Sequence, residues 1–473
     1  MRRDRIVSRL ACVTLVATAL AGCSSDAPVA PDDHQPPDVS LSVQAGAAGD
    51  GWAATSQHVL LFEDAVPDDL NARISALGGT IVRVHPEIDA AVVDGLDDAD
   101  AATLATDADI ASATRDLVVQ SLPDLNSLAG TQSLPAGGVA GHDPTTAAFF
   151  PFQWDMQIID ADDAWNAGYD DASGVRVAIL DTGLDPFHID MAGNIDAAAS
   201  IAYIPSVAGV GPPWGDDYFH GTHVGGTVVT NGIGTSGVAP HATLIAVKVC
   251  DNAGGCSFAA VMSGLVHAAS VDADVANMSL GGFVNIPAGS GPLNAALNRA
   301  VNYASSHGVL VVSAAGNSAV DLDHIERNFR DFGVRAFRAS PCENGNGMCI
   351  SATGPTDALA SYSNYGRSAV SVAAPGGDFN GDVFASTVLS PCSSLGIVCF
   401  GSTSTYLFLQ GTSMAAPHVS GAAALLDGQF GGGLNAGQLG ARLRNSADDL
   451  GKKGADPIYG HGRINVGNLL GAN

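Results

Sequence analysis

Two successive patterns of apolar and polar residues predict two folded parts. From residue 142 onward, apolar β-branched runs typical of buried strands alternate with stretches that place apolar residues at helical spacing. This alternation predicts an α/β fold, in which a doubly wound, mostly parallel sheet carries helices on both faces. Buried strands are expected at 175–180, 244–249, 275–279, 309–313 and 369–372, and helices at 258–269 and 293–306.

A shorter pattern precedes this larger domain. Residues 57–120 read as strand, helix, strand, strand, helix, strand, which predicts a small α+β domain of ferredoxin-like βαββαβ order. Its first helix places Leu70, Ile74 and Leu77 on one face and stops at the glycine pair that follows. Residues 121–141, rich in Ser, Pro, Gly and Leu, are expected to be a linker, so the larger domain spans 142–473.

The first 22 residues have the composition of a targeting signal. Four arginines precede an apolar run at 10–20, so residues 1–22 are excluded from the fold. The run ends in Leu20-Ala21-Gly22-Cys23, which resembles the lipobox of bacterial lipoproteins, where the cysteine is lipidated and becomes the new N-terminus. The alternative is an ordinary cleavage site that happens to end in Cys. Residues 23–56 are expected to be a flexible tether.

The eight cysteines indicate an exported protein, and the net charge limits the kinds of partner it can bind. Besides Cys12 and Cys23 there are three close pairs: Cys250/Cys256, Cys342/Cys349 and Cys392/Cys399. If each pair closes a local disulfide, as export permits, none remains for Cys23, which favours its acylation. The formal net charge of −28 argues against a nucleic-acid binder, which needs a basic face.

Four motifs carry candidate chemistry, each at an expected strand end or helix start. Taken singly, their polar residues could be turn or cap residues. All four motifs together in one α/β chain would rarely arise by chance. The motifs are Leu180-Asp181-Thr182-Gly183, His220-Gly221-Thr222-His223-Val224-Gly225-Gly226, Ala314-Ala315-Gly316-Asn317 and Gly411-Thr412-Ser413-Met414-Ala415-Ala416-Pro417-His418.

In the order Asp, His, Asn, Ser, these motifs resemble the signatures of the subtilisin-like serine peptidases nearly letter for letter. The similarity covers residues 175–470 and implies a subtilisin-like fold. The small domain resembles the family's inhibitory propeptide and folding chaperone. The resemblance therefore implies a precursor that inhibits and processes itself, with the maturation site within 121–141.

The resemblance implies a catalytic triad of Asp181, His220 and Ser413. A serine hydroxyl is a weak nucleophile until a base takes its proton, which would be the role of His220. Asp181 would fix the imidazole tautomer and stabilise the imidazolium. Asn317 would donate its side-chain amide to the oxyanion, together with the backbone N–H of Ser413.

The substrate-binding residues are also implied by the resemblance. Ser279, Leu280 and Gly281 would form the strand edge that pairs with an extended peptide. Ala315 and Gly316 would line the pocket for the residue before the scissile bond. Because backbone pairing is indifferent to side chains, a serine endopeptidase with broad specificity for protein and peptide substrates is expected.

Calcium in a structural role is the one cofactor that the resemblance suggests. Asp190 and Asn231 are the expected ligands, and Asp143 or Gln153 could contribute. The alternative is that Asp190 caps a turn. No catalytic metal is expected.

The remaining histidines of the motifs are expected to be structural. His220 and His223 could be read as metal ligands, but a zinc-binding helix would need i, i+4 spacing with a Glu between them. His223 and His418 are therefore expected to pack in the interior.

Two other function classes agree less well with the motifs. An α/β-hydrolase esterase also uses Ser, His and Asp, but it needs Gly-x-Ser-x-Gly and the chain order Ser, Asp, His, whereas residue 415 is Ala and the order is reversed. A catalytically inactive binding protein would normally lack a triad member, and none is missing. The expectation is an exported monomer that binds peptides, its own propeptide and, through Cys23, a membrane, with release of the mature enzyme after processing.

Overall fold

The computed structural model describes residues 52–122, 130–134, 143–207, 209–285, 289–328 and 337–472, all within one compact unit. The expected signal peptide and Cys23 lie outside these residues, as does most of the expected tether.

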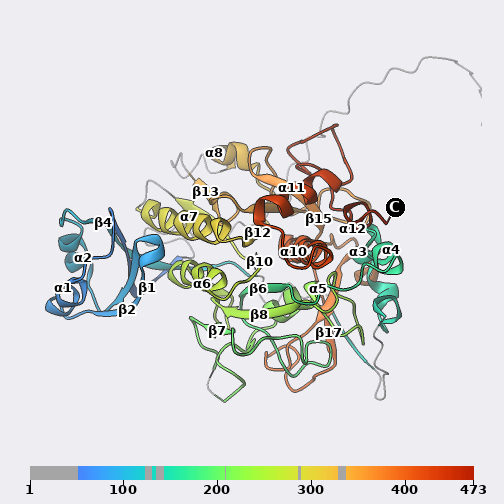
Figure 1. The fold of residues 1–473 in the computed structure, drawn as a ribbon, viewed down its shortest axis with the longest axis horizontal. Helices are drawn as coiled ribbons and strands as arrows, with labels where there is room; N and C mark the ends of the chain where they lie inside the picture. The colour runs from blue at the N-terminus through green and yellow to red at the C-terminus, as the bar shows by residue number, and fades with distance from the viewer. Residues whose placement is uncertain are drawn as a thin grey trace, which may run out of the picture. The chain divides into compact units, whose positions relative to one another are not determined.

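A seven-stranded sheet forms the centre of the larger domain (Figure 1). Every neighbouring pair is parallel, in the order β15-β14-β12-β10-β6-β8-β7. All five expected strands occur, and the expected α/β fold is confirmed. The strands are β6 (Arg176–Asp181), β7 (Ile201–Ala202), β8 (Thr243–Lys248), β10 (Val275–Met278), β12 (Leu310–Ala314), β14 (Met348–Thr353) and β15 (Val370–Pro375).

Helices cover both faces of this sheet. In Figure 1, α6 (Phe258–Ser270) and α7 (Gly291–Ser306) lie on one side, and α5 (His220–Val228) and α10 (Thr412–Gln429) on the other. Helix α10 is buried through almost its whole length because small residues, mostly Ala, Gly and Ser, let it approach the strands closely. The remaining helices are α3 (Trp154–Ile158), α4 (Ala161–Asn166), α8 (Ile325–Asn328), α9 (Val383–Ser386), α11 (Ala436–Ser446) and α12 (Val466–Leu470).

The small N-terminal domain has its six elements in the expected order. Its helices pack Leu70, Ile74 and Leu104 onto a core with Leu60 and Phe62. The elements are β1 (Trp52–Phe62), α1 (Leu70–Ala76), β2 (Thr80–His85), β3 (Ala90–Asp94), α2 (Asp98–Leu104) and β4 (Ile110–Gln120).

Two strands extend into segments where the sequence indicates none. Strand β1 begins at Trp52, within the expected tether, because Trp52 and the two alanines after it pair with the apolar end of β4. Strand β5 (Gly130–Ser133) lies within the expected linker and pairs with β17 (Thr405–Leu409), which also pairs with β16 (Val388–Pro391). A further hairpin joins β11 (Gly282–Asn285) to β13 (Phe337–Ser340).

The small domain docks onto α6 and α7 through both apolar and polar contacts. Arg299 on α7 donates to the main-chain oxygens of Phe62, Ile88 and Asp89 at 3.1–3.2 Å. His85 Nε2 lies 2.8 Å from Ser263 Oγ on α6. Strand β9 (Gly255–Ser257), from the larger domain, extends the small domain's sheet by pairing with β4.

Among the described residues, no helix combines the length and apolar character needed to cross a bilayer.

Candidate active site

The four candidate catalytic residues gather where parallel strands end. Asp181 is the last residue of β6, and Asn317 follows β12 by three residues. His220 begins α5 and Ser413 is the second residue of α10. The C-terminal edge of a parallel sheet is where open α/β folds bind their ligands.

His220 and Asp181 form a buried hydrogen-bonded pair. Nδ1 of His220 lies 2.9 and 3.0 Å from the two carboxylate oxygens of Asp181, and both side chains are fully buried. An ionised carboxylate only accepts hydrogen bonds, so Nδ1 carries the proton. Nε2 of His220 is buried without a hydrogen-bond partner among the described residues, which leaves its lone pair available as a base.

Ser413 is held by Ser279, the residue after β10. The Ser413 hydroxyl donates to the Ser279 main-chain oxygen at 3.1 Å, and the Ser279 hydroxyl donates to the Ser413 main-chain oxygen at 2.7 Å. The second bond has a local cause, because Pro417 has no N–H to donate to the helical carbonyl four residues before it. Since a hydroxyl carries one proton, the Ser413 proton points to Ser279 and not to His220 in this resting arrangement.

Asn317 is oriented by the residue that opens α10. Its Oδ1 accepts hydrogen bonds from the backbone N–H and the hydroxyl of Thr412, at 2.8 and 2.7 Å. This fixes which way the amide faces and leaves Nδ2 free to donate. A Cβ built on Gly411 would lie 3.5 Å from Asn317 Nδ2 and 3.6 Å from Ser413 N, so the glycine keeps open the space between these two donors.

Asp216 joins the segments that carry Asp181 and His220. Its buried carboxylate accepts hydrogen bonds from the Thr182 hydroxyl at 2.8 Å and from the Thr222 N–H at 2.8 Å. The Thr182 hydroxyl accepts one from the Gly221 N–H at 2.9 Å. Burial raises the pKa of Asp216 to about 6. The sequence does not single out Asp216, because an Asp-Asp pair before the motif looks like an ordinary polar loop.

The sequence profile of the subtilase family matches residues 172–462. The chain belongs to the subtilase family. Over 326 residues it is 34% identical to thermitase from Thermoactinomyces vulgaris, covering 68% of this chain and 97% of thermitase. Over 315 residues it is 36% identical to subtilisin Savinase from Lederbergia lenta, covering 66% of this chain and 96% of that protein.

Solved subtilase structures share the fold. The epidermin leader peptide processing serine protease EpiP from Staphylococcus aureus superimposes with a TM-score of 0.70 at 22% identity. That match covers 88% of this chain and 98% of EpiP. The subtilisin-like fold expected from the motifs is confirmed, and so is membership of a serine peptidase family.

The residues expected to bind substrate follow the ends of β10 and β12. Ser279 belongs to the network around Ser413, while Leu280 and Gly281 line a small, mostly apolar cavity together with Val119 of β4. Gly316 adopts a left-handed backbone with φ of 100°, where a Cβ would come within 2.5 Å of Asn364 Nδ2. Ala315 is buried, and its main-chain oxygen accepts a hydrogen bond from Asn364 Nδ2 at 2.8 Å.

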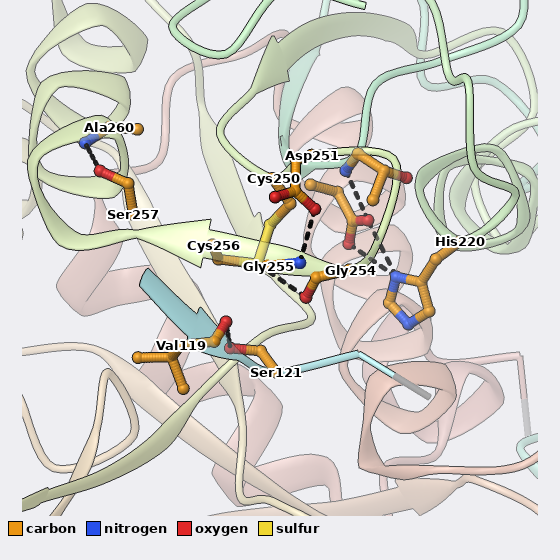
Figure 2. The surroundings of a disulfide bond; sticks show 12 residues. Val119, Ser121, His220, Cys250, Asp251, Gly254, Gly255, Cys256, Ser257 and Ala260 are labelled. Atoms are coloured by element: carbon orange, nitrogen blue, oxygen red, sulfur yellow. Dashed lines mark hydrogen bonds and ion pairs between the residues drawn. A yellow bond between two sulfur atoms is a disulfide. The ribbon is translucent and has the colours of Figure 1, made fainter. Parts of the chain in front are cut away.

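Strand β9, which pairs with the end of the small domain, is an element that the sequence did not indicate. Val118, Val119 and Gln120 of β4 pair antiparallel with it, and the Ser121 N–H donates to the Gly254 oxygen at 3.3 Å. Figure 2 shows this pairing beside the disulfide, with His220 nearby. A three-residue Gly-Cys-Ser strand has no apolar alternation by which to recognise it.

Subtilases commonly bind structural calcium, but Asp190 is not available as a ligand here. Its buried carboxylate accepts hydrogen bonds from the N–H groups of Ile233, Gly234 and Thr235, at 2.8–3.1 Å, and from the Tyr406 hydroxyl at 2.7 Å. Four donors use the roughly four lone-pair sites of a carboxylate. Asp190 as placed therefore does not fit a calcium ligand, and the expected calcium site stays a prediction.

The other expected calcium ligands are also used by protein groups. Asn231 donates to the oxygens of Ile189 and Ala192, at 2.9 and 3.0 Å. Gln153 exchanges hydrogen bonds with the Ser236 backbone, and Asp143 caps a turn. Among the described residues, no group of three or more His, Cys, Asp or Glu could hold a metal ion. Asn231 as placed does not fit a calcium ligand either.

The three expected cysteine pairs are disulfides: Cys250–Cys256, Cys342–Cys349 and Cys392–Cys399.

His223 is buried between two strands, and Nε2 lies 3.2 and 3.0 Å from the oxygens of Val388 and Leu407. Burial lowers its pKa to about 3. His418 Nε2 lies 3.0 Å from Asp155 Oδ2, and both residues are fully buried. Both histidines have the interior positions expected of structural residues.

Proposed function

We propose that this subtilase is a serine endopeptidase that cleaves peptide bonds through an acyl-enzyme, with Asp181, His220 and Ser413 as its triad. The observation that carries the proposal is the buried His220–Asp181 pair at the sheet edge where α10 begins, with Ser413 as its second residue. Ser413 would rotate from Ser279 toward Nε2 of His220 and lose its proton as it attacks the carbonyl carbon. Asn317 Nδ2 and the Ser413 N–H would stabilise the oxyanion.

Two variants test this mechanism in the full-length protein. Ser413→Ala should abolish both peptide hydrolysis and labelling by a fluorophosphonate. Asn317→Ala should lower kcat by about 10²- to 10³-fold, a range taken from the corresponding subtilisin change. Hydrolysis that survives in Ser413→Ala at wild-type rate would contradict the assigned nucleophile.

The small domain is proposed to be an inhibitory propeptide. Support comes from β4, whose C-terminal end pairs with β9 as an extended peptide would, and from Leu122, which is 5% exposed. The Ser413→Ala precursor, expressed without other peptidases, should remain uncleaved across 121–141. Normal processing of that variant would contradict self-processing.

The precursor is further proposed to be exported as a monomer and lipidated on Cys23. Cleavage within 121–141 would then separate the peptidase from its lipid, because the anchor lies on the propeptide side. Cell fractionation should find the precursor in membranes and the processed enzyme in the medium. A Cys23→Ala precursor that still partitions into membranes would contradict the lipid anchor, and processed enzyme found wholly in membranes would contradict release.

A further inference from the structure

Lys248, the last residue of β8, is fully buried next to the candidate triad. It stands opposite Asp181 in the register of β6 and β8. Within the described residues, Arg463 is the only other Lys or Arg side chain that the structure buries. Burying a charged group costs free energy unless hydrogen bonds replace its hydration, so the partners of Lys248 indicate its role.

The Lys248 ammonium uses all three of its hydrogens on acceptors of this chain. Nζ donates to the Thr182 main-chain oxygen at 2.5 Å, to Asp217 Oδ1 at 2.8 Å and to the Cys250 main-chain oxygen at 3.1 Å. A neutral amine has only two hydrogens, so three acceptors fit the charged form. Asp217 is also buried, and its carboxylate compensates the buried charge.

The three acceptors belong to three segments around the His220–Asp181 pair. Thr182 directly follows Asp181, and Asp217 lies three residues before His220. The N–H of Cys250 donates to the Asp181 main-chain oxygen at 3.2 Å. One ammonium therefore connects the chain on both sides of the pair.

Other hydrogen bonds hold parts of this arrangement, but they do not replace the ammonium. The Val249 N–H also donates to the Asp181 main-chain oxygen, at 2.9 Å. Within the described residues, the main-chain oxygens of Thr182 and Cys250 accept a hydrogen bond only from Lys248. Both residues are fully buried, so loss of the ammonium leaves two buried carbonyls without a donor.

The charge of Lys248 also acts on the carboxylate of Asp216. Burial raises the pKa of Asp216 to about 6, and its hydrogen bonds together with the charge of Lys248 act against this rise. Lys248 therefore favours the ionised Asp216, which accepts the hydrogen bonds that join the segments of Asp181 and His220.

We propose that Lys248 is a positioning residue for the candidate triad: its ammonium, paired with Asp217, holds the segments that place Asp181 against His220. The inference rests on the proposed peptidase function and adds to it a buried residue that acts through this pair. The alternative is that the ion pair only stabilises the fold. A loss of stability alone lowers the amount of active enzyme and not the turnover of each active site.

The test replaces Lys248 by methionine, which has a similar length and no charge. In the processed enzyme, kcat per active site, counted by fluorophosphonate titration, should fall about 10- to 10²-fold, because a misplaced His220–Asp181 pair slows the chemical step. KM should change little, since the residues expected to bind substrate are not altered. The low-field ¹H resonance of the His220 Nδ1 proton should shift in the same variant, and this readout does not depend on turnover.

Arg463→Met is the matched control, because it removes the other buried basic side chain, which pairs with Asp357 and Asp448. It should lower Tm and leave both kcat per active site and the His220 resonance unchanged. The double variant Lys248→Met/Asp217→Asn covers the case in which Lys248→Met does not fold, since it leaves no unpaired buried carboxylate. It should regain stability and keep the low kcat.

The two proposals can fail separately. Wild-type values of both kcat per active site and the His220 resonance, in whichever Lys248 variant folds, overturn the positioning role and leave the peptidase assignment standing. A wild-type enzyme that hydrolyses no peptide contradicts the peptidase assignment, and the His220 resonance then still decides whether Lys248 positions the pair.

Discussion

Ser413 and Ser279 exchange two hydrogen bonds, each hydroxyl donating to the other residue's main-chain oxygen. The Ser279 hydroxyl is held in turn by Asn277 Nδ2 at 2.9 Å, and Asn277 Oδ1 accepts from Ser420 at 2.8 Å. A chain of polar side chains therefore connects β10 to α10 at Ser413 and at Ser420. Ser413 is the residue whose carbonyl lacks its usual helical donor because of Pro417.

Ser279→Ala should lower kcat by about tenfold with KM little changed, because the loss of one buried hydrogen bond leaves the Ser413 carbonyl without a donor. Steady-state kinetics, normalised by active-site titration, measure the effect. Ser420→Ala is the control, since it breaks the same chain two residues further from Ser413 and should cost less. Equal losses in both variants would contradict a direct action of Ser279 on Ser413.

Thr182→Val should also lower kcat more than it changes KM. The Thr182 hydroxyl donates to Asp216 and accepts from the N–H of Gly221, so it couples the end of β6 to the start of α5. Thr182→Ser retains the hydroxyl and should retain most activity, whereas the nearly isosteric valine loses both bonds. A serine variant as impaired as the valine variant would indicate that packing, not hydrogen bonding, is what matters.

Tyr406→Phe should destabilise the protein, because Tyr406 is the only side-chain donor within the described residues to the buried carboxylate of Asp190. A loss of about 1–2 kcal/mol, or a few degrees in Tm, is expected for a domain of this size. Tyr169→Phe is a suitable control, since within the described residues its hydroxyl makes no hydrogen bond.

The Tm of the wild-type protein should not change when EDTA is added, because hydrogen-bond donors already satisfy the Asp190 carboxylate. A large fall in Tm would contradict a calcium-independent arrangement of the loop 233–235.

Docking of the small domain should weaken at acidic pH. Burial against α6, followed by the charge of Arg83, lowers the pKa of His85 to about 4. In the separated domain His85 would titrate near its usual value of about 6.5. Because the docked form holds this proton less tightly, docking is strongest above pH ~6.5 and weakens as the pH falls toward 4.

Gel filtration of the processed complex at pH 7.5 and pH 5 measures this dependence. Asp116 acts in the opposite direction, since burial raises its pKa and the docked form binds its proton more tightly. His85→Gln, which cannot titrate, separates the two effects and should remove the acid-induced loss. A complex that dissociates at pH 5 equally in both proteins would assign the effect to other groups.

The sequence predicts the sheet because its central strands are continuous apolar runs, a signal that burial on both faces produces. It singles out the candidate catalytic residues because they lie in short contiguous motifs. Contacts between distant positions leave no such signal. Tyr406 reaches Asp190 across 216 positions of chain, and neither residue alone indicates the other. For the same reason the family pattern suggested calcium at Asp190, although hydrogen-bond donors from this chain already satisfy the carboxylate.

If the precursor is cut within 121–141 as proposed, the position of the cut decides what happens to strand β5. Gly130–Ser133 pairs with β17, the strand that leads into Gly411 and Ser413. If the cut falls before Gly130, the new N-terminal segment stays as the third strand of that small sheet. If it falls after residue 134, this segment departs with the propeptide and leaves one edge of β17 open to pair with another extended chain. The choice of a single peptide bond would then decide whether the mature enzyme carries its own edge cover or offers that edge to other polypeptides.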